Sequence, residues 1–324
     1  MIREANWIWR DGAVIPWRDA NLHLLSLAVQ FGSSVFEGVR CYATPRGPAI
    51  FRWQEHLRRL FDSCRIYRMV PEWTAEQLTA ATAALITRNE LDACYIRPMV
   101  LRGYGDAGMM PAVSPIETFI ACWPWGTYLG DGALEQGVDV CVSTWQRPAP
   151  NTFPALAKAA GHYNNAQLIK MEAMANGYVE AIALAPNGLV SEGSGQNVFL
   201  VRDGILRTTA VDGTILSGIT RASIITLARD LGIEVERGAI PREMLYTADE
   251  VFFTGTAAEV TPIRSIDRIE IGAGSAGPVT RVLQKRFLDI VHGRAADDHG
   301  WLTHVESIPG AVEGAAEVRS ATAR

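Results

Sequence analysis

The chain has 324 residues, of which 48% are hydrophobic and 20% charged, with a formal net charge of −5 and a pI near 5.7. This composition is typical of a globular protein of about two domains, and the absence of a basic stripe argues against nucleic-acid binding. The apolar runs are too short to span a membrane, and the first residues lack the apolar core of a signal peptide. The five cysteines are widely spaced and form no CxxC pair, so no disulfide framework and no metal site are expected. We therefore expect a cytoplasmic protein that acts on small molecules, with no nucleic-acid or membrane partner.

The first 130 residues carry local signals for both strands and helices. Asp11-Gly12 between apolar runs predicts a hairpin over 7–17. Leu57, Leu60 and Cys64 share one face of a helix expected over 54–67, and a capping box at Thr74–Gln77 predicts the start of a second helix. Strands are expected over 94–102 and 117–123.

The second half repeats this mixture of elements. Asn187-Gly188 and Asp203-Gly204 predict two further hairpins, and helices are expected over about 219–231 and 278–291. This order indicates α+β domains with much antiparallel pairing. The expected boundaries are an N-terminal domain over 1–128, a glycine-rich linker over 129–138, a C-terminal domain over 139–300 and a poorly ordered tail over 301–324.

Lys158 is the first candidate for a catalytic residue. The chain has only three lysines, and Lys158 is flanked by Ala157 and Ala159 with no acidic residue within four positions. Burial lowers the pKa of an amine and produces a neutral nucleophile, which attacks carbonyl groups to form Schiff bases. This is the chemistry of pyridoxal phosphate enzymes. The segment alone favours the other interpretation, a partly exposed lysine on a turn of small residues.

Three segments could bind a phosphate. Leu216–Arg221 opens a helix, whose N–H groups and dipole favour an anion, although Ser217 could instead be an ordinary N-cap. Thr256 follows a strand and Gly255, and could donate to the same phosphate or sit in a structural turn. Arg59 lies off the apolar stripe of its helix and could fork onto phosphate oxygens, unless it is a solvated surface arginine.

Glu192 is a candidate partner for a pyridine ring. It follows a strand and precedes the small residues Gly193–Gly195, which permit close approach. A carboxylate there could keep a ring nitrogen protonated, as the electron sink requires, or could simply face water. A second glycine-rich segment, Gly272–Gly277, matches the dinucleotide pattern GxGxxG, but no second strand with an acidic end follows it. We therefore interpret it as a loop and not as a nicotinamide site.

In this order, eight segments resemble the class IV (fold type IV) pyridoxal phosphate aminotransferases, and within them the bacterial branched-chain amino acid aminotransferases. The resemblance runs from about Trp7 to Trp301. It implies a smaller N-terminal α/β domain, a larger C-terminal pseudo-barrel domain that binds the cofactor, and a homodimer or higher homo-oligomer. The segments are Gly32–Tyr42, Glu55–Leu60, Tyr95–Pro98, Pro124–Gly130, Ala157–Ala159, Ser191–Gly193, Gly218–Arg221 and Gly255–Glu259.

The resemblance also implies roles for single residues. Lys158 would form the Schiff base with pyridoxal 5′-phosphate and move the proton at the substrate Cα. Arg97 would receive the distal carboxylate of glutamate. The other implied cofactor residues are Arg59, Tyr163, Glu192, Leu216, Ile219, Thr220 and Thr256, and the other implied substrate residues are Phe36, Tyr95, Trp125, Tyr128, Ala257 and Ala258.

Departures from the family pattern affect the expected specificity. Phe31 stands where bacterial relatives often carry Tyr, the loop over 105–115 differs from the usual sequence, and Gln196 replaces a frequent Glu. The expected function is transamination between branched-chain L-amino acids and 2-oxoglutarate. The alternatives are a D-amino acid or (R)-amine transaminase, an aminodeoxychorismate lyase-like enzyme, and a cofactor-binding protein without turnover.

Overall fold

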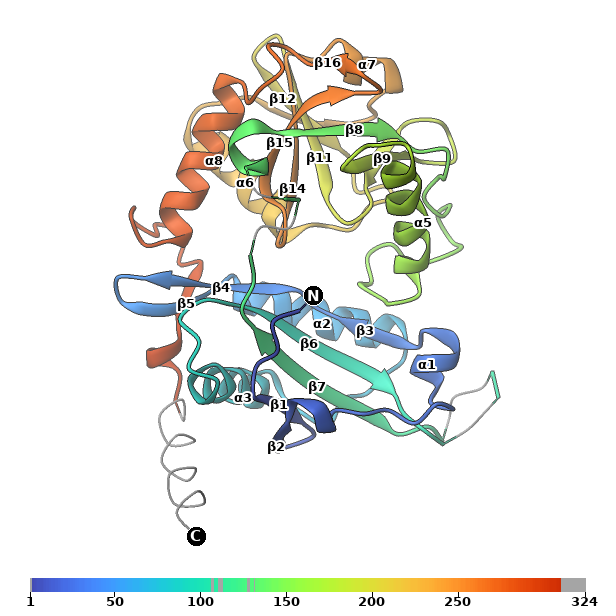
Figure 1. The fold of residues 1–324 in the computed structure, drawn as a ribbon, viewed down its shortest axis with the longest axis vertical. Coiled ribbons are helices and arrows are strands. Elements are labelled where there is room, and N and C mark those ends of the chain that lie inside the picture. The colour runs from blue at the N-terminus through green and yellow to red at the C-terminus, as the bar shows by residue number, and fades with distance from the viewer. Residues whose placement is uncertain (1, 106–107, 110–112, 127–128, 131, 310–324) are drawn as a thin grey trace. The chain divides into compact units, whose positions relative to one another are not determined.

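Two compact units make up the chain in the computed structural model, which describes residues 2–105, 108–109, 113–126, 129–130 and 132–309 (Figure 1). Unit 1 comprises Met1–Gly126, Ala157–Gly161 and Asp289–Arg324, and unit 2 comprises Thr127–Leu156 and His162–Leu288. Each unit contains its own sheet and helices, and this mixed architecture confirms the expected α+β fold class.

The unit boundaries differ from the contiguous domains expected from the sequence. Ala157–Gly161 and the residues from Asp289 onward belong to unit 1, although they lie inside the segment 139–300. Backbone pairing explains the first difference, because the N–H of Phe36 donates to the Lys158 carbonyl at 3.0 Å and the N–H of Ala160 donates to the Ser34 carbonyl at 2.9 Å. A short segment that carries Lys158 is thereby attached to unit 1.

Unit 1 is built on an antiparallel sheet of eight strands, in the order β17-β5-β4-β6-β7-β1-β2 with β3 beside β6. Its helices α2 and α3 bury Leu57, Leu60, Leu78 and Leu85 in a common core with the strands. The strands are β1 (Trp7–Arg10), β2 (Ala13–Pro16), β3 (Ser34–Phe36), β4 (Val39–Thr44), β5 (Gly47–Phe51), β6 (Cys94–Arg102), β7 (Ile116–Trp123) and β17 (Leu302–His304). The helices are α1 (Leu27–Phe31), α2 (Trp53–Ile66), α3 (Ala75–Arg88) and the 3-10 turns η1 (Trp17–Asp19) and η2 (Val305–Ser307).

Unit 2 is built on a mixed sheet of nine strands, in the order β10-β9-β8-β15-β14-β11-β12-β13 with β16 beside β15. The pairs β8–β9, β8–β15 and β12–β13 are parallel and the others are antiparallel. The strands are β8 (Val138–Val142), β9 (Glu180–Leu184), β10 (Val190–Gly193), β11 (Asn197–Arg202), β12 (Ile205–Thr209), β13 (Val235–Gly238), β14 (Glu250–Gly255), β15 (Glu259–Ile266) and β16 (Ile269–Glu270). The helices are α4 (Ala133–Gln136), α5 (His162–Ala175), α6 (Ile219–Asp230), α7 (Arg242–Tyr246) and α8 (Pro278–Val291).

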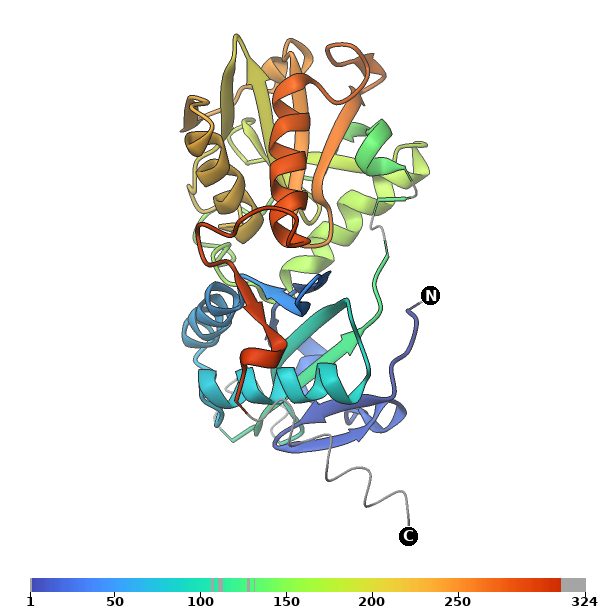
Figure 2. The same cartoon turned by 90° about the vertical axis from the view of Figure 1, so that its left-hand side faces the viewer.

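Strands β9, β10, β11 and β14 of unit 2 are buried on both faces, and the alternation of side chains along a strand assigns each one to one face. Along β9, Ile182 joins the main core of the unit, while Ala181 and Ala183 pack with Ile169 and Ala173 of α5. Helix α8 runs beside this sheet, and the amide of Gln284 donates to the Val260 carbonyl of β15 at 2.8 Å (Figures 1 and 2).

The local turn signals are confirmed. Asp11 and Gly12 both have positive φ angles (44° and 88°), as do Asp203 and Gly204 (54° and 76°), which is the geometry of two-residue hairpin turns. The capping box at Thr74 is present.

Two segments near the end of the chain test further expectations. Strand β16 pairs antiparallel with β15, so Gly272–Gly277 is not the turn of a βαβ unit. The expectation of a poorly ordered tail from 301 is wrong for its first residues. Trp301 is buried and β17 pairs with β5, because Arg52 and Trp301 form a backbone hydrogen bond and a cation–π contact at 5.2 Å. Residues 310–324 lie outside the described part of the chain.

Candidate active site

The backbone of Lys158 is fixed on both sides by unit 1. Its carbonyl accepts from Phe36 of β3, and its N–H donates to Ser63 Oγ of α2 at 3.0 Å. The neighbours Ala157 and Ala159 are each 1% exposed, whereas Lys158 itself is half-buried. The small neighbours therefore let the chain pack closely on both sides of Lys158.

The Phe36 ring is the apolar surface beside this amine. The ammonium of Lys158 lies 5.1 Å from the ring centroid, and the guanidinium of Arg97 lies 4.5 Å from the same centroid. The two cations are therefore less than about 10 Å apart, both within cation–π distance of one ring. The structure thus brings together three residues that the sequence assigned to catalysis and substrate binding.

Aromatic rings extend this surface. The Tyr95 ring lies 4.7 Å from the Trp125 ring and 5.1 Å from the Trp123 ring, and Arg97 lies 5.4 Å from the Tyr95 ring. A Cβ on Gly38 would come within 1.9 Å of the Tyr95 hydroxyl, so glycine leaves the room that this ring needs. The predicted residue Tyr128 lies outside the described part of the chain.

Arg59 is not a solvated surface arginine. Its Nε and Nη2 donate to the two carboxylate oxygens of Glu37 at 2.6 and 2.8 Å, and its side chain is 13% exposed. His56 Nδ1 lies 2.6 Å from Glu37 Oε2. Burial alone would raise the pKa of Glu37, but Arg59, with a smaller effect of His56, holds that pKa well below its usual range. The sequence identified Arg59 but not the carboxylate that orients it.

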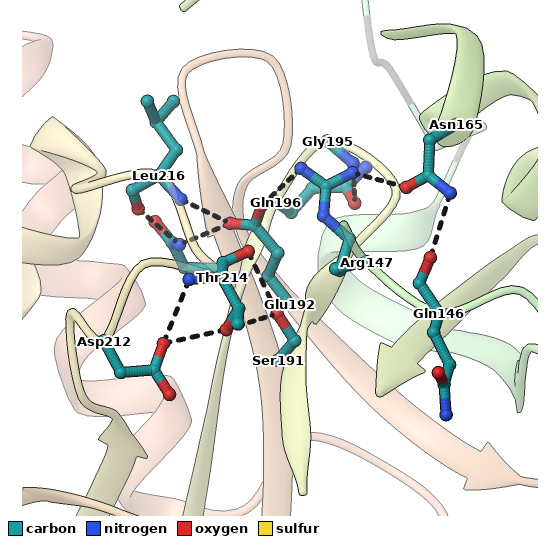
Figure 3. Close-up of polar contacts among 11 residues, drawn as sticks. Gln146, Arg147, Asn165, Ser191, Glu192, Gly195, Gln196, Asp212, Thr214 and Leu216 are labelled. Atoms are coloured by element: carbon teal, nitrogen blue, oxygen red, sulfur yellow. Dashed lines mark hydrogen bonds and ion pairs between the residues drawn. The ribbon is translucent and has the colours of Figure 1, made fainter. Parts of the chain in front are cut away.

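In unit 2 Glu192 is buried and fully engaged, not facing water (Figure 3). Its Oε1 forms an ion pair with Arg147 Nη2 at 2.9 Å, and its Oε2 accepts from the Asn197 amide at 3.0 Å and the Leu216 N–H at 3.1 Å. Arg147 also donates to Asn165 Oδ1 at 3.2 Å. Sequence reasoning missed both partners. Asn197 is only five residues from Glu192, at the start of the next strand, whereas Arg147 is 45 residues away and its proximity depends on the tertiary fold.

The loop that precedes α6 is tied to the same carboxylate. The Leu216 N–H donates to Glu192, and the Leu216 carbonyl accepts from the Asn197 amide. Gly218 is the N-cap residue of α6, and no side chain forms a hydrogen bond at this cap. The alternative interpretation, in which Ser217 is the N-cap residue of this helix, is therefore wrong. A Cβ on Gly218 would come within 1.9 Å of Asn197 Oδ1, so this start of the helix requires glycine. Ile219 and Thr220 occupy the first turn, where backbone N–H groups favour an anion.

The remaining predicted residues also lie in unit 2. Tyr163 is half-buried in the first turn of α5, beside His162, whose pKa is lowered to about 4 by burial and then by the charge of Arg147. Thr256, Ala257 and Ala258 form the turn between β14 and β15.

Gln196 faces a carboxylate of its own unit. Its amide donates to Glu180 Oε2 at 3.0 Å, and the Lys170 ammonium lies 3.3 Å from the same oxygen. Gln196 also accepts from the Gly195 N–H at 3.1 Å (Figure 3). A glutamate at position 196 would therefore oppose the buried carboxylate of Glu180.

Other kinds of site find little support in the described chain. Among its residues no three His, Cys, Asp or Glu side chains are grouped so as to hold a metal ion. None of the described helices is both long enough and apolar enough to cross a membrane.

Comparison with known proteins identifies the class of enzyme. The family model "Amino-transferase class IV" matches residues 34–266, which is more than half of the chain. The chain therefore belongs to the class IV aminotransferases. It is 47% identical over 306 residues to the branched-chain-amino-acid aminotransferase of Escherichia coli (strain K12), covering 94% of this chain and 98% of that protein. It is 45% identical to the enzyme of the same name from Pseudomonas aeruginosa, covering 92% of this chain and 97% of that protein.

Solved structures agree with this assignment. A crystal structure of the Escherichia coli branched-chain amino acid aminotransferase has a TM-score of 0.92 at 47% identity, covering 93% of this chain and all of the other. A T.th. branched-chain amino acid aminotransferase complexed with N-(5′-phosphopyridoxyl)-L-glutamate has a TM-score of 0.89 at 44% identity, covering 93% and 99% of the two chains. The expected family and fold are thus confirmed.

Proposed function

We propose that this chain catalyses transamination between branched-chain L-amino acids and 2-oxoglutarate, with pyridoxal 5′-phosphate held as a Schiff base on Lys158. The observation that carries the proposal is the Phe36 ring, with the Lys158 ammonium and the Arg97 guanidinium both within about 5 Å of its centroid. This arrangement supports the proposal, because a cation that could receive a second carboxylate lies less than about 10 Å from the proposed reacting amine and shares an aromatic neighbour with it.

The chain's residues fit the proposed cofactor in their donor chemistry. Glu192 is a buried carboxylate that Arg147 favours in its ionised form, as a partner for a protonated ring nitrogen requires. The glycine N-cap of α6 is suited to a phosphate, with Thr256 as a further donor and Arg59 as a cation. Tyr163 would donate to the phenolic oxygen and Leu216 would pack on the ring. When bound, the cofactor withdraws electrons from the substrate Cα.

Lys158 is proposed to take the proton from the substrate Cα and would deliver it to C4′ of the cofactor. Its fixed backbone limits where the amine can move, and fixed geometry is a large part of the rate advantage of a general base. The neutral amine is the form that accepts this proton.

The side-chain pocket is proposed to serve two kinds of substrate. Phe36, Tyr95 and Trp125 offer apolar area for leucine, isoleucine and valine. Arg97 would bind the distal carboxylate of glutamate, and Tyr128, Ala257 and Ala258 are proposed as further substrate-binding residues. Relatives support both kinds of substrate, since T.th. enzymes are described in complex with N-(5′-phosphopyridoxyl)-L-glutamate and with 4-methylvaleric acid.

A panel of amino donors tests the proposal. Both enantiomers of leucine, isoleucine, valine, alanine and 1-phenylethylamine would be offered with 2-oxoglutarate or pyruvate as acceptor. We expect the L-branched-chain donors with 2-oxoglutarate to give the highest kcat/KM. A preference for D-amino acids or (R)-amines would instead establish the first alternative, and release of pyruvate from aminodeoxychorismate would establish the lyase.

We further propose a homodimer or a higher homo-oligomer. Unit 1 exposes an apolar group around α1, in which Leu24 is 73%, Val29 50% and Phe31 53% exposed. Contiguous exposed apolar residues are typical of protein–protein contacts. Light scattering of the purified chain would give the number of subunits, and a monomer at micromolar concentration would contradict this part of the proposal. A cytoplasmic location stays a prediction.

A further inference from the structure

Glu37 has no assigned role, although it contacts the candidate residue Arg59 and follows the candidate residue Phe36 in unit 1. It follows β3, is 0% exposed, and its N–H donates to the Pro98 carbonyl at 2.9 Å. Both carboxylate oxygens accept from the Nε–Nη2 edge of Arg59, at 2.6 and 2.8 Å, and His56 Nδ1 lies 2.6 Å from Oε2. A buried carboxylate with three contacts of this length holds its partners in one orientation.

The charges of this cluster are balanced. Arg59 keeps Glu37 ionised at neutral pH despite its burial. The pKa of His56 is lowered, first by burial and further by Arg59 and Lys158, although Glu37 opposes the shift. With a neutral His56, the formal charges of Glu37 and Arg59 cancel.

We infer that Glu37 is a positioning residue for phosphate binding, because it holds the Nε–Nη2 edge of Arg59 and thereby fixes the orientation of the side chain that the proposed function assigns to the cofactor phosphate. The inference rests on the proposed function. It also changes the expectation for Arg59, since the formal charges of the Glu37–Arg59 pair cancel and Arg59 is not an unbalanced cation. Arg59 should therefore contribute through its orientation, which Glu37 fixes.

The same cluster is connected to the reactive amine. Ser63 Oγ donates to the Arg59 carbonyl at 2.8 Å and accepts from the Lys158 N–H at 3.0 Å. Phe36, the residue before Glu37, donates to the Lys158 carbonyl at 3.0 Å. A displacement of Glu37 would thus affect Lys158 as well as Arg59, and a test must separate phosphate binding from the position of the amine.

Two probes make that separation. Pyridoxal 5′-phosphate and pyridoxal share the aldehyde that reacts with Lys158, and only the first carries a phosphate. Their dissociation constants would be measured by absorbance on cofactor-free Glu37→Gln, Arg59→Met and the double variant. Glu55→Gln is the matched control, because Glu55 also lies next to an arginine of this segment, the N-cap residue Arg52 of α2, and its side chain is 38% exposed.

We expect Glu37→Gln to weaken binding of the phosphate-bearing probe by about 10–100-fold, by analogy with residues that orient the ligands of a metal ion. Pyridoxal binding should change by less than about threefold, and Glu55→Gln should leave both constants at wild-type values. In the Arg59→Met background, Glu37→Gln should cause no further loss of phosphate-dependent affinity, because its partner is already absent.

Equal weakening of both probes by Glu37→Gln would overturn the inference, since Glu37 would then act on Lys158 or on the fold. Additive losses in the double variant would overturn it too. If Glu37→Gln does not fold, Glu37→Asp keeps the charge but shortens the side chain, and the same phosphate-selective loss is expected. A wild-type protein that binds both probes equally would refute the phosphate site of the proposed function itself.

Discussion

Removal of Arg147 should destabilise the cofactor-free protein through Glu192. In Arg147→Met the Glu192 carboxylate keeps the contacts from Asn197 and Leu216 but loses its ion pair with Arg147, between side chains 10% and 6% exposed. Breaking a buried pair costs about 3–5 kcal/mol, and the two remaining donors favour the lower end, about 3 kcal/mol at pH 8. At pH 5.5 protonation of an ordinary glutamate costs only about 1.6 kcal/mol, so the loss should fall to about that value.

Urea unfolding of cofactor-free protein at both pH values measures the effect. The double variant Arg147→Met, Glu192→Gln should recover at least about 2 kcal/mol at pH 8, because no buried charge remains. Arg264→Met is the control, since the Arg264–Asp139 pair is about 40% exposed and should contribute at most about 1 kcal/mol. A double variant as unstable as the sum of the single changes, or a loss independent of pH, would refute the reasoning.

Three further outcomes are expected. Arg97→Ala should lower kcat/KM for glutamate by about 10–100-fold and for leucine much less, and equal losses would show that Arg97 binds the α-carboxylate common to both. Gly38→Ala should displace Tyr95 and raise KM for leucine, while Gly238→Ala, whose Cβ meets nothing within 4 Å, should not, and unchanged kinetics in both would contradict the steric argument. The unfolded chain protonates His162 near pH 6.5 and the folded chain only near pH 4, so stability should fall by up to about 3 kcal/mol as the pH drops through that interval. In His162→Gln the free energy of unfolding, measured with urea across this pH interval, should lack this fall. A pH profile unchanged from wild type would exclude His162 as its source.

Local signals predicted much of the fold. Helix α2 was expected over 54–67 and occupies Trp53–Ile66, because its apolar spacing alone defines the buried face. Helix α5 was not predicted, since its buried contact with β8 and β9 is narrow and includes only a few small or aliphatic side chains. Strand β17 was also missed, because three residues pair with a strand about 250 positions earlier and leave no local pattern.

Residue types in the candidate site could be predicted, but their partners could not. The motif around Lys158 and the carboxylate of Glu192 indicate the chemistry from the sequence alone. The pairing of Arg59 with Glu37 and of Glu192 with Arg147 depends on which strands and helices come together, and neither spacing is periodic. These partners decide the charge and orientation of the site residues. The sequence therefore indicates the reaction better than it indicates the charge and orientation of those side chains.

Covalent labelling tests the central claim most directly. The protein would be incubated with pyridoxal 5′-phosphate, reduced with borohydride and digested, and the modified peptide identified by mass spectrometry. The chain has only three lysines, so the result is easily read. We expect the label on Lys158 and its loss, together with all measurable transamination, in Lys158→Ala, since no other amine can replace the nucleophile. A label on Lys170 or Lys285, or turnover that survives in Lys158→Ala, would contradict the account.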